Sequence, residues 1–256
     1  MAQPRIAVTG AAGTVGTRLC EDLATDYEVV RIDLRDADVV ADVRDPKAMH
    51  AALAGCDTVI HLAGTVAVDA AWDDVYGSNI GGTYNVYEAA RANGLRRIVF
   101  ASSNHAVGMN EVENAPKIYE PGFGRTIGTG DPYRPDGLYG VWKAFGEVLG
   151  RYYSDAFGMQ VACVRIGSIT GADDPRHESV RASSGWLNLT DEQKFARYAA
   201  TWMSQRDFAR LVRCILVRDV RFAIVYGVGD NATRFWDLEA GRAIYGFWPL
   251  DGVRPA

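Results

Sequence analysis

A tyrosine and a lysine stand four residues apart in the segment GLYGVWK, residues 137–143. The apolar periodicity of 138–157 predicts a helix, on which Tyr139 and Lys143 share one face, one turn apart. A tyrosine hydroxyl has an unperturbed pKa of about 10, and a neighbouring ammonium group favours its ionised form. Such a phenolate can take a proton from a substrate alcohol, so the pair indicates general base catalysis. The same spacing also occurs by chance on solvent-exposed helices.

A second chemical signal is the segment TGAAGTVG, which lies between an expected strand, 5–10, and an expected helix, 14–24. Its glycines are Gly10, Gly13 and Gly16. Without side chains, their backbone N–H groups can approach a pyrophosphate beside the positive end of the helix. The segment therefore predicts a dinucleotide site, with a purely structural tight turn as the alternative.

Asp33 ends the next expected strand, about twenty residues after the glycines, where dinucleotide-binding folds hold a ribose. A carboxylate there accepts hydrogen bonds from both ribose hydroxyls and repels a 2′-phosphate, which favours NAD over NADP. Arg35, two residues further along, would soften that preference. Asp42 and Val43 follow the third expected strand and are placed to contact the adenine, although Asp42 also suits a plain turn.

The elements that position these residues alternate between strands and helices. We expect strands at 5–10, 28–34, 39–43, 58–64, 96–103, 160–167 and 222–227. We expect helices at 14–24, 46–55, 71–93, 138–157, 191–203, 204–217 and 237–246. Alternation at this spacing predicts an α/β fold, a Rossmann-like doubly wound parallel sheet that helices cover on both faces.

The expected elements divide the chain by role. Residues 1–167 form the expected NAD-binding domain with the Tyr–Lys helix, and residues 168–256 a small C-terminal substrate-binding cap, interwoven as one structural unit. The helix 71–93 is expected to bend near its adjacent glycines, Gly81 and Gly82. The Pro- and Gly-rich stretch 109–137 is too long for an idle connection and predicts a functional loop or lid.

Composition excludes several classes of function. The chain has 256 residues and a net charge of -5, and it lacks the basic face that a non-specific nucleic-acid binder needs. No apolar run reaches the roughly 18 residues of a membrane span, and the N-terminus leads directly into a strand, without room for a signal peptide. The four cysteines lack metal-binding or redox spacing, which favours reduced thiols in a cytosolic protein. We therefore expect a cytoplasmic enzyme with no metal, membrane or nucleic-acid partner.

Several motifs together resemble the extended short-chain dehydrogenase/reductases, the NAD-dependent epimerase/dehydratase family. The motifs are TGAAGTVG, Asp33, HLAG at 61–64, Asn79 in SNIGGTYNV, the strand end FASS and YGVWK. The resemblance covers almost the whole chain and implies NAD as the cofactor and Ser103, Tyr139 and Lys143 as the catalytic residues. In such enzymes the serine holds the reacting oxygen, the tyrosine moves the proton and the lysine grips the nicotinamide ribose.

The expected cofactor site extends from the glycine turn to the catalytic helix. Its expected residues are Gly10, Ala12, Gly13, Thr14, Val15, Gly16, Asp33, Asp42, Val43, Leu62, Ala63, Gly64, Asn79, Tyr139 and Lys143. Ala63 and Gly64 offer a second close approach at a strand end. Asn79 matches the family's helix-positioning and proton-relay asparagine, a role compatible with a structural hydrogen bond.

A narrower resemblance joins this chain to the uronate dehydrogenases and related NAD-dependent sugar 1-dehydrogenases, including an archaeal glucose-6-phosphate type. It is carried by FASSNH, RPDGLYGVWK, VRIGS at 164–168 and RYAATWMSQRDF at 197–208. The implied substrate-binding residues are Ser103, Asn104, His105, Tyr139, Ser168 and Arg197. By this resemblance Arg197 binds the anionic end of the sugar, with a surface charge as the alternative. His105 is either a sugar contact or a buried structural histidine.

Two departures from the uronate enzymes bear on the substrate. Those enzymes carry a substrate-binding serine shortly after the HLxG loop, and here that position is Val66. The segments 109–135 and 171–195 are longer than in the bacterial uronate enzyme, and they flank the expected pocket. One hydroxyl contact and the choice of sugar are therefore open.

The leading hypothesis is NAD-dependent oxidation of a cyclic acidic sugar, glucuronate or galacturonate, at C1 to a lactone. The first alternative is a sugar phosphate or another aldose in the same reaction. A nucleotide-sugar epimerase or dehydratase shares the catalytic residues, but the segment after Gly167 is short for covering a sugar nucleotide. A dinucleotide-sensing regulator ranks last, because such proteins typically lose the tyrosine or lysine kept here. The family often dimerises through the helices here near 75–93 and 138–157, so we expect a homodimer or higher homo-oligomer.

Overall fold

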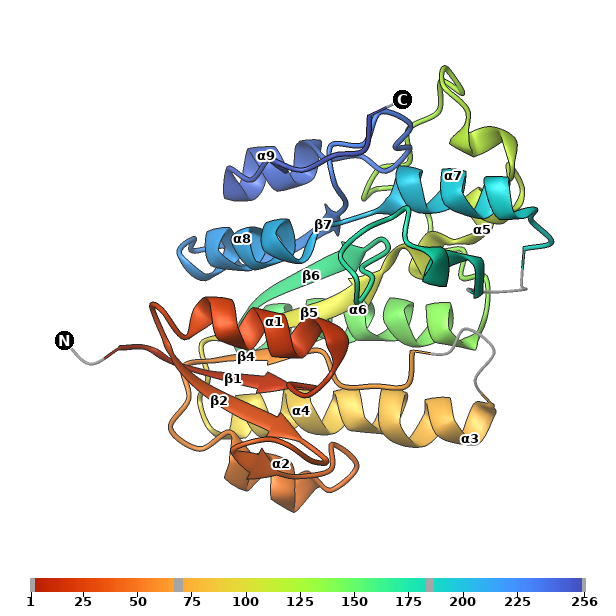
Figure 1. The fold of residues 1–256 in the computed structure, drawn as a ribbon. Coiled ribbons are helices and arrows are strands. Elements are labelled where there is room, and N and C mark those ends of the chain that lie inside the picture. Colours follow the sequence, from red (N-terminus) through yellow and green to blue (C-terminus); the bar gives the residue numbers. More distant parts are fainter. Residues whose placement is uncertain (1–2, 67–70, 183–186, 255–256) are drawn as a thin grey trace.

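The described strands form one parallel sheet in the order β3-β2-β1-β4-β5-β6-β7 (Figure 1). This computed structural model describes residues 3–66, 71–182 and 187–254. The strands are β1 (Arg5–Thr9), β2 (Glu28–Asp33), β3 (Val39–Val40), β4 (Thr58–His61), β5 (Arg97–Ser103), β6 (Gln160–Ile166) and β7 (Phe222–Gly227). The strand order reverses between β1 and β4, and open parallel sheets bind ligands at the carboxyl ends beside such a switch point. The expected Rossmann-like α/β fold is confirmed.

Helices cover both faces of the sheet. They are α1 (Thr14–Leu23), α2 (Pro46–Ala52), α3 (Trp72–Asp74), α4 (Gly82–Ala92), α5 (Met109–Val112), α6 (Leu138–Phe157), α7 (Asp191–Thr201), α8 (Gln205–Leu216) and α9 (Glu239–Tyr245). Helices α2, α4 and α6 pack on one face, and α1, α8 and α9 pack on the other (Figure 1). Within the described residues, no helix combines the length and apolar character that crossing a bilayer requires.

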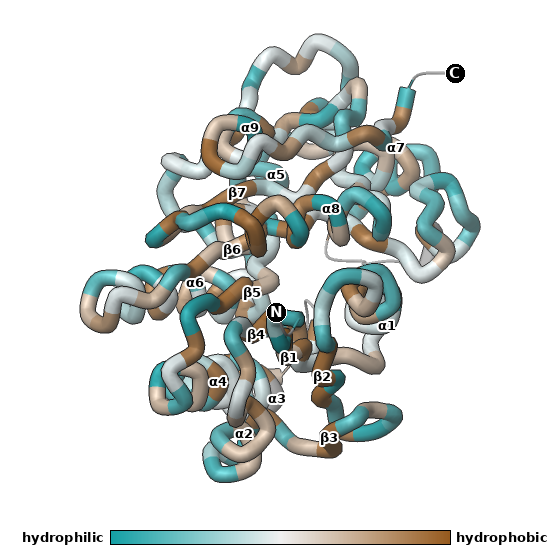
Figure 2. The backbone as a smooth tube through the Cα atoms, turned by 90° about the vertical axis from the view of Figure 1, so that its left-hand side faces the viewer, coloured by the Kyte–Doolittle hydropathy of each residue, from teal (hydrophilic) through white to brown (hydrophobic). Residues whose placement is uncertain are grey.

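Alternate residues of the central strands supply two hydrophobic cores. In β5, Ile98 and Phe100 pack with α2, α4 and α6, whereas Val99 packs with α1 and α8. Strands buried on both faces are apolar along their length, and Figure 2 shows them as a hydrophobic centre between the helices. Every residue of β5 is buried, including the two serines that end it. The strand therefore carries Ser102 and Ser103 to one fixed place at the edge of the sheet.

The segment 71–93 is helical as expected, but it changes type along its length. Helix α3 is followed by a π-helical turn, η1 (Val75–Gly81), and then by α4. Gly82 packs so closely on Val43 that an added Cβ would lie 2.6 Å from Val43 Cγ2. The π-helical turn ends at Gly81 and α4 begins at Gly82, so the change of helix type falls at the two glycines where a bend was expected.

The stretch expected as a loop or lid contains short helical turns. Within 109–137 these are α5 and η3 (Lys117–Tyr119); η2 (Asn104–Val107) directly precedes the stretch, and η4 (Glu178–Ala182) lies after β6. Buried Ile118, Tyr119 and Ile127 join the residues around β7 in a third hydrophobic cluster. The stretch is thus packed against the cap. Residues 183–186 of the expected 171–195 loop lie outside the described residues.

The chain beyond Gly167 also completes the sheet. Strand β7 pairs in parallel with β6, and α8 packs against α1 over the same face. Tyr226 of β7 stacks on Trp236, with the ring centroids 5.2 Å apart, and so ties the sheet to the third cluster. Residues 1–167 and 168–256 therefore share one sheet and one core. Their division into a cofactor-binding part and a substrate-binding part stays a prediction about function.

Candidate active site

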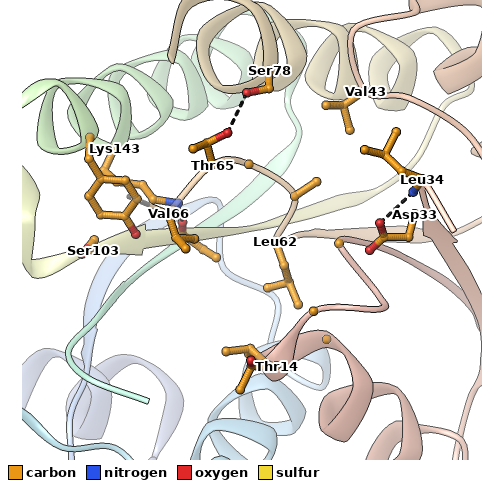
Figure 3. Close-up of a pocket in the computed structure, with 18 of the residues that line it drawn as sticks. Thr14, Asp33, Leu34, Val43, Leu62, Thr65, Val66, Ser78, Ser103 and Lys143 are labelled. Carbon is orange, nitrogen blue, oxygen red and sulfur yellow. Dashed lines mark hydrogen bonds between the residues drawn. The ribbon is translucent and has the colours of Figure 1, made fainter. Parts of the chain in front are cut away.

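A cavity of about 820 Å³ lies at the carboxyl ends of the central strands (Figure 3). Its wall follows one strand end after another: Gly10 after β1, Asp33 on β2, Gly64 after β4, Ser103 on β5 and Gly167 after β6. Helix α6 adds Tyr139 and Lys143 to the same wall. The two chemical signals of the sequence therefore face one cavity.

The glycine turn has the shape that a pyrophosphate needs. Gly10 has a φ of +76°, and an added Cβ would lie 2.7 Å from the backbone nitrogen of Ala63. A Cβ on Gly16 would lie 2.1 Å from the carbonyl oxygen of Gly10. Gly13 is the N-cap of α1 and offers no side chain to bond the first N–H groups of the helix. The bare turn and these uncapped N–H groups fit a bound diphosphate.

Asp33 is held by two backbone amides beside this turn. Its Oδ2 accepts a hydrogen bond from Ala12 N at 2.9 Å, and its Oδ1 accepts one from Leu34 N at 2.7 Å (Figure 3). Ala12 itself does not line the cavity. Arg35 is exposed and also lies off the wall. The Asp33 carboxylate is thus held on the cavity wall by backbone hydrogen bonds, and Arg35 does not line the cavity.

Asp42 and Val43 form the far wall of the cavity. The Asp42 carboxylate accepts two hydrogen bonds from the guanidinium of Arg44, at 2.9 and 2.6 Å. These hydrogen bonds lower the pKa of Asp42 below its usual value. The Val43 side chain is mostly buried. It packs against Gly82 and also lines the cavity. An apolar wall beside a guanidinium suits a flat heteroaromatic ring.

The loop after β4 is fixed from two sides. Gly64 has a φ of +153°, and an added Cβ would lie 2.2 Å from the Trp142 ring. The Asn79 side chain is buried, accepts a hydrogen bond from Thr65 N at 2.7 Å and donates one to Thr65 O at 3.0 Å. Ser78 Oγ lies 3.4 Å from the Thr65 hydroxyl (Figure 3). Asn79 does not line the cavity, but it is hydrogen-bonded to Thr65 and Ser78, which do.

Ser103, Tyr139 and Lys143 meet at the carboxyl end of β5. Burial raises the pKa of Tyr139 to about 12, and a hydrogen bond with Ser103 opposes this rise. Lys143 is 3% exposed, and its Nζ donates to Ala101 O at 2.6 Å. Burial lowers the pKa of Lys143 well below its ordinary value, while the Glu147 carboxylate opposes this change. A hydroxyl pair and an amine are thereby gathered against one wall.

Glu147 and Arg165 form a buried ion pair that the sequence did not reveal. Glu147 Oε2 lies 2.9 Å from Arg165 Nη2, and both side chains are almost fully buried. The hydroxyl of Ser102 donates to the same carboxylate. Glu147 stands one helical turn after Lys143, and this spacing is the signal that could have drawn attention to it. The ion pair connects α6, which carries Tyr139 and Lys143, to β6, and the Ser102 hydrogen bond connects it to the end of β5.

His105 and Asn104 lie beside Tyr139 and Ser103 and not on the cavity wall. His105 Nδ1 lies 2.7 Å from Asp136 Oδ2, and its ring meets the Tyr139 ring edge to face, with centroids 5.4 Å apart. Asn104 is buried, and its Oδ1 accepts a hydrogen bond from Ser103 at 3.1 Å. Both residues support the Ser103–Tyr139 pair, and their direct contact with a sugar stays a prediction.

Ser168 and Arg197 belong to the cap and also lie off the wall. Ser168 Oγ lies 2.8 Å from Thr201 Oγ1. Arg197 is 5% exposed, and its Nε donates to Glu111 Oε1 at 2.6 Å. The alternative that Arg197 is a surface charge is therefore wrong. Its contact with the anionic end of a sugar stays a prediction.

The sequence-predicted residues thus form two groups. Those on the wall are Gly10, Gly13, Thr14, Val15, Gly16, Asp33, Asp42, Val43, Leu62, Ala63, Gly64, Ser103, Tyr139 and Lys143. Those off the wall are Ala12, Asn79, Asn104, His105, Ser168 and Arg197. Val66 lines the cavity with a 70% exposed apolar side chain. In the parts of the chain that the structure describes, no three His, Cys, Asp or Glu side chains are grouped to hold a metal ion.

Comparisons with known proteins agree with this geometry. The model of the NAD dependent epimerase/dehydratase family matches residues 6–225. L-arabinose 1-dehydrogenase (NAD(P)(+)) of Haloferax volcanii is 45% identical over 96% of this chain and 96% of its own length. NAD-dependent glucose-6-phosphate dehydrogenase of the same organism is 37% identical over 98% of this chain and 94% of its own. A mutant uronate dehydrogenase of Agrobacterium tumefaciens, solved with NAD, is 36% identical with a TM-score of 0.79, over 98% of this chain and 86% of its own.

Proposed function

Because the chain belongs to the NAD-dependent epimerase/dehydratase family, we propose that its cavity binds NAD and a cyclic sugar, and that the enzyme oxidises the sugar at C1 to a lactone. It is an NAD-dependent oxidoreductase of the kind that acts on a sugar CH–OH group. One observation supports the proposed reaction most directly. Ser103 and Tyr139 are hydrogen-bonded to each other and line the same cavity as the glycine turn. In this proposal Tyr139 is the base for the alcohol proton, and the cavity that it lines also has the glycine turn proposed for the dinucleotide.

The residues that would hold NAD are those of the cavity wall. The glycine turn and the first N–H groups of α1 receive the diphosphate, and Asp33 accepts hydrogen bonds from the adenosine ribose. Val43 and the Arg44–Asp42 pair border the adenine end. Lys143 takes the nicotinamide ribose. NAD, when bound, accepts the hydride that leaves C1.

The protein's own groups handle the proton. Ser103 donates a hydrogen bond to the C1 oxygen, and Tyr139 takes the proton of the C1 hydroxyl as the hydride departs. The C1–O bond then becomes the carbonyl of the lactone, so one proton and one hydride leave the sugar. Burial raises the pKa of Tyr139 to about 12, and the hydrogen bond with Ser103 opposes this rise, so Ser103 helps Tyr139 to carry the negative charge of a phenolate.

The identity of the sugar is a finer question. The similar proteins are named for L-arabinose, for glucose 6-phosphate and for uronates, so a neutral pentose, a sugar phosphate and an acidic sugar are all represented. The expectation of glucuronate or galacturonate depends on Arg197 as an anion contact. The structure instead pairs Arg197 with Glu111, an observation that favours a neutral aldose.

A substrate panel tests the proposed reaction. Purified protein with NAD is given L-arabinose, D-galactose, D-glucose, D-galacturonate, D-glucuronate and glucose 6-phosphate, and NADH is followed by absorbance. We expect at least one sugar to reduce NAD stoichiometrically, with the matching lactone or its hydrolysed acid seen by NMR. Absence of NADH with every sugar would reject the proposal. A product epimerised or dehydrated without net NADH would point to the epimerase alternative.

The variant Tyr139→Phe tests the role of the hydroxyl. It keeps the ring that packs against His105 and Trp142 and removes only the proton acceptor. We expect turnover to fall about 10²–10⁴-fold, the usual contribution of general acid–base catalysis, while NAD affinity measured by calorimetry stays unchanged. Turnover within a few-fold of the wild type would rule out Tyr139 as the base.

A further inference from the structure

Glu111 and Arg197 form an ion pair in the interior of the cap. Arg197 Nε donates to Glu111 Oε1 at 2.6 Å, and the two side chains are 7% and 1% exposed. The hydroxyl of Tyr119 donates to the same Oε1 at 2.8 Å. The pair joins α5, which follows the polar end of β5, to α7 of the cap. The ion pair is therefore held by two elements, α5 and α7.

Contacts through Thr201 connect this ion pair to the part of the cavity where the proposed sugar would bind. That part, the sugar end, is bounded by Val66, Ser103, Tyr139 and Gly167. Gly167 packs directly on Thr201 of α7, where an added Cβ would lie 2.1 Å from the Thr201 carbonyl oxygen. Thr201 in turn donates from its hydroxyl to the carbonyl oxygen of Arg197 at 2.9 Å, one turn earlier on the helix.

The guanidinium groups of Arg44, Arg165 and Arg197 are each paired with a carboxylate of the chain itself. Among the described residues of the cavity wall, the cationic ones are Lys143, which belongs to the catalytic group, and Arg44, which pairs with Asp42 at the adenine end. Buried Arg165 is paired with Glu147, at 2.9 Å. Arg197 is paired with Glu111 in the same way.

We propose that Glu111 holds Arg197 away from the sugar end and thereby makes the enzyme selective for an uncharged aldose over the corresponding uronate. This inference rests on the proposed function. An acidic sugar would bring a carboxylate into a space whose nearby guanidinium groups are already neutralised. Its charge would lose water without gaining a partner, which is costly in a protein interior. A neutral hydroxymethyl group or a pentose carries no such cost.

The geometry also explains why the pair does not simply open for an acidic substrate. The Glu111 carboxylate is buried with a guanidinium and the Tyr119 hydroxyl on it. Releasing Arg197 to a ligand would leave this carboxylate without its counter-charge in the interior, and removing one partner of a buried pair is strongly destabilising. Breaking the Glu111–Arg197 ion pair would therefore offset the free energy that a substrate carboxylate gains by binding Arg197.

Matched sugars test the inference on the wild-type enzyme. D-galactose and D-galacturonate differ only in the group at C6, as do D-glucose and D-glucuronate. We expect kcat/KM for the neutral member to exceed that of the uronate by about tenfold or more, mainly through KM, in at least one pair. A uronate that is preferred within both pairs would overturn the inference and leave the proposed function standing. No NADH with any sugar would instead remove the proposed function and the inference together.

The variant Glu111→Gln tests the residue itself. It keeps the size of the side chain and an oxygen for Tyr119, but it removes the charge that holds Arg197. We expect the uronate-to-neutral ratio of kcat/KM to rise about tenfold, with a smaller change for the neutral sugar. Adding Arg197→Met to this variant should abolish the gain, because no guanidinium is then left to turn toward the substrate.

The matched control is Glu113→Gln, which removes an acid two residues away that pairs with Arg134 on the surface. It should leave the ratio unchanged. An unchanged ratio in folded Glu111→Gln, or an equal rise in Glu113→Gln, would overturn the role of Glu111. If Glu111→Gln fails to fold, the wild-type comparison within the two sugar pairs decides the inference.

Discussion

Asp33 performs two tasks at one position. Its carboxylate accepts the N–H groups of Ala12 and Leu34, which fixes the start of the glycine turn, and it faces the cavity where a ribose would bind. The charge and the place of Asp33 at a strand end could be predicted from the sequence. The two backbone hydrogen bonds could not, because they depend on the exact path of the turn.

The variant Asp33→Asn tests the part that charge plays in choosing the cofactor. The amide keeps an oxygen for the backbone N–H groups but no longer repels a 2′-phosphate. We predict that the ratio of kcat/KM for NAD to that for NADP falls about tenfold, a change of ~1.4 kcal/mol. The measurement is initial rates with each cofactor at a saturating sugar concentration. An unchanged ratio in an active variant would contradict this role.

At the scale of elements, a buried chain of hydrogen bonds connects β1, β4, α4 and α6. His61 Nδ1 lies 2.7 Å from Thr9 Oγ1, and its Nε2 lies 3.1 Å from Thr83 Oγ1. Trp142 Nε1 donates to the same Thr83 hydroxyl at 2.8 Å. Burial lowers the pKa of His61 to about 3, and the nearby Lys143 lowers it further. The imidazole is therefore neutral in the folded protein above that pH.

This shift predicts how acid destabilises the fold. In the unfolded chain His61 takes a proton below about pH 6.5, whereas in the folded chain it takes one only near pH 3. Its contribution to stability is present above pH 6.5 and is lost as the pH falls toward 3. We predict a loss in the free energy of unfolding of up to about 1.4 kcal/mol per pH unit from this group, measured by urea unfolding between pH 4.5 and 7.5.

The variant His61→Gln isolates this contribution, because other groups titrate in the same range. As the pH is lowered from 7.5 to 4.5, the free energy of unfolding of His61→Gln should fall less steeply than that of the wild type. This holds whatever the stability of the variant at pH 7.5. Exposed His50 supplies the control, and His50→Gln should keep the wild-type slope. Parallel slopes for the wild type and His61→Gln would contradict a lowered pKa of His61 in the folded protein.

The ends of helices and strands could be predicted from the sequence where a single residue, such as a glycine after a helix, determines them. Helix α6 ends at Phe157 as expected, because Gly158 adopts the left-handed conformation with a φ of +74°. Strand β4 was expected to reach Gly64 but ends at His61, where the chain turns to approach the glycine turn. The π-helical turn Val75–Gly81 was missed because, over seven residues, the apolar pattern does not distinguish a π-helical turn from an α-helix.

At the scale of the whole molecule, the topology accounts for how the site is assembled. Parallel strands place all their carboxyl ends on one edge, so the glycine turn, Asp33 and Ser103 had to meet there once the fold was recognised. The pairs that set charge around the sugar were beyond the sequence. Glu111 and Arg197 are 86 residues apart, and only the packing of the cap on the sheet brings them together.

Transfer of deuterium from the sugar tests the central claim most directly. An aldose that the enzyme accepts is prepared with deuterium at C1 and incubated with the protein and NAD, and the recovered dinucleotide is examined by NMR and mass spectrometry. We predict one deuterium on the nicotinamide ring of the reduced cofactor and none left at C1 of the lactone. Deuterium that stays on the sugar, or that is lost to water, would contradict oxidation at C1 by this site.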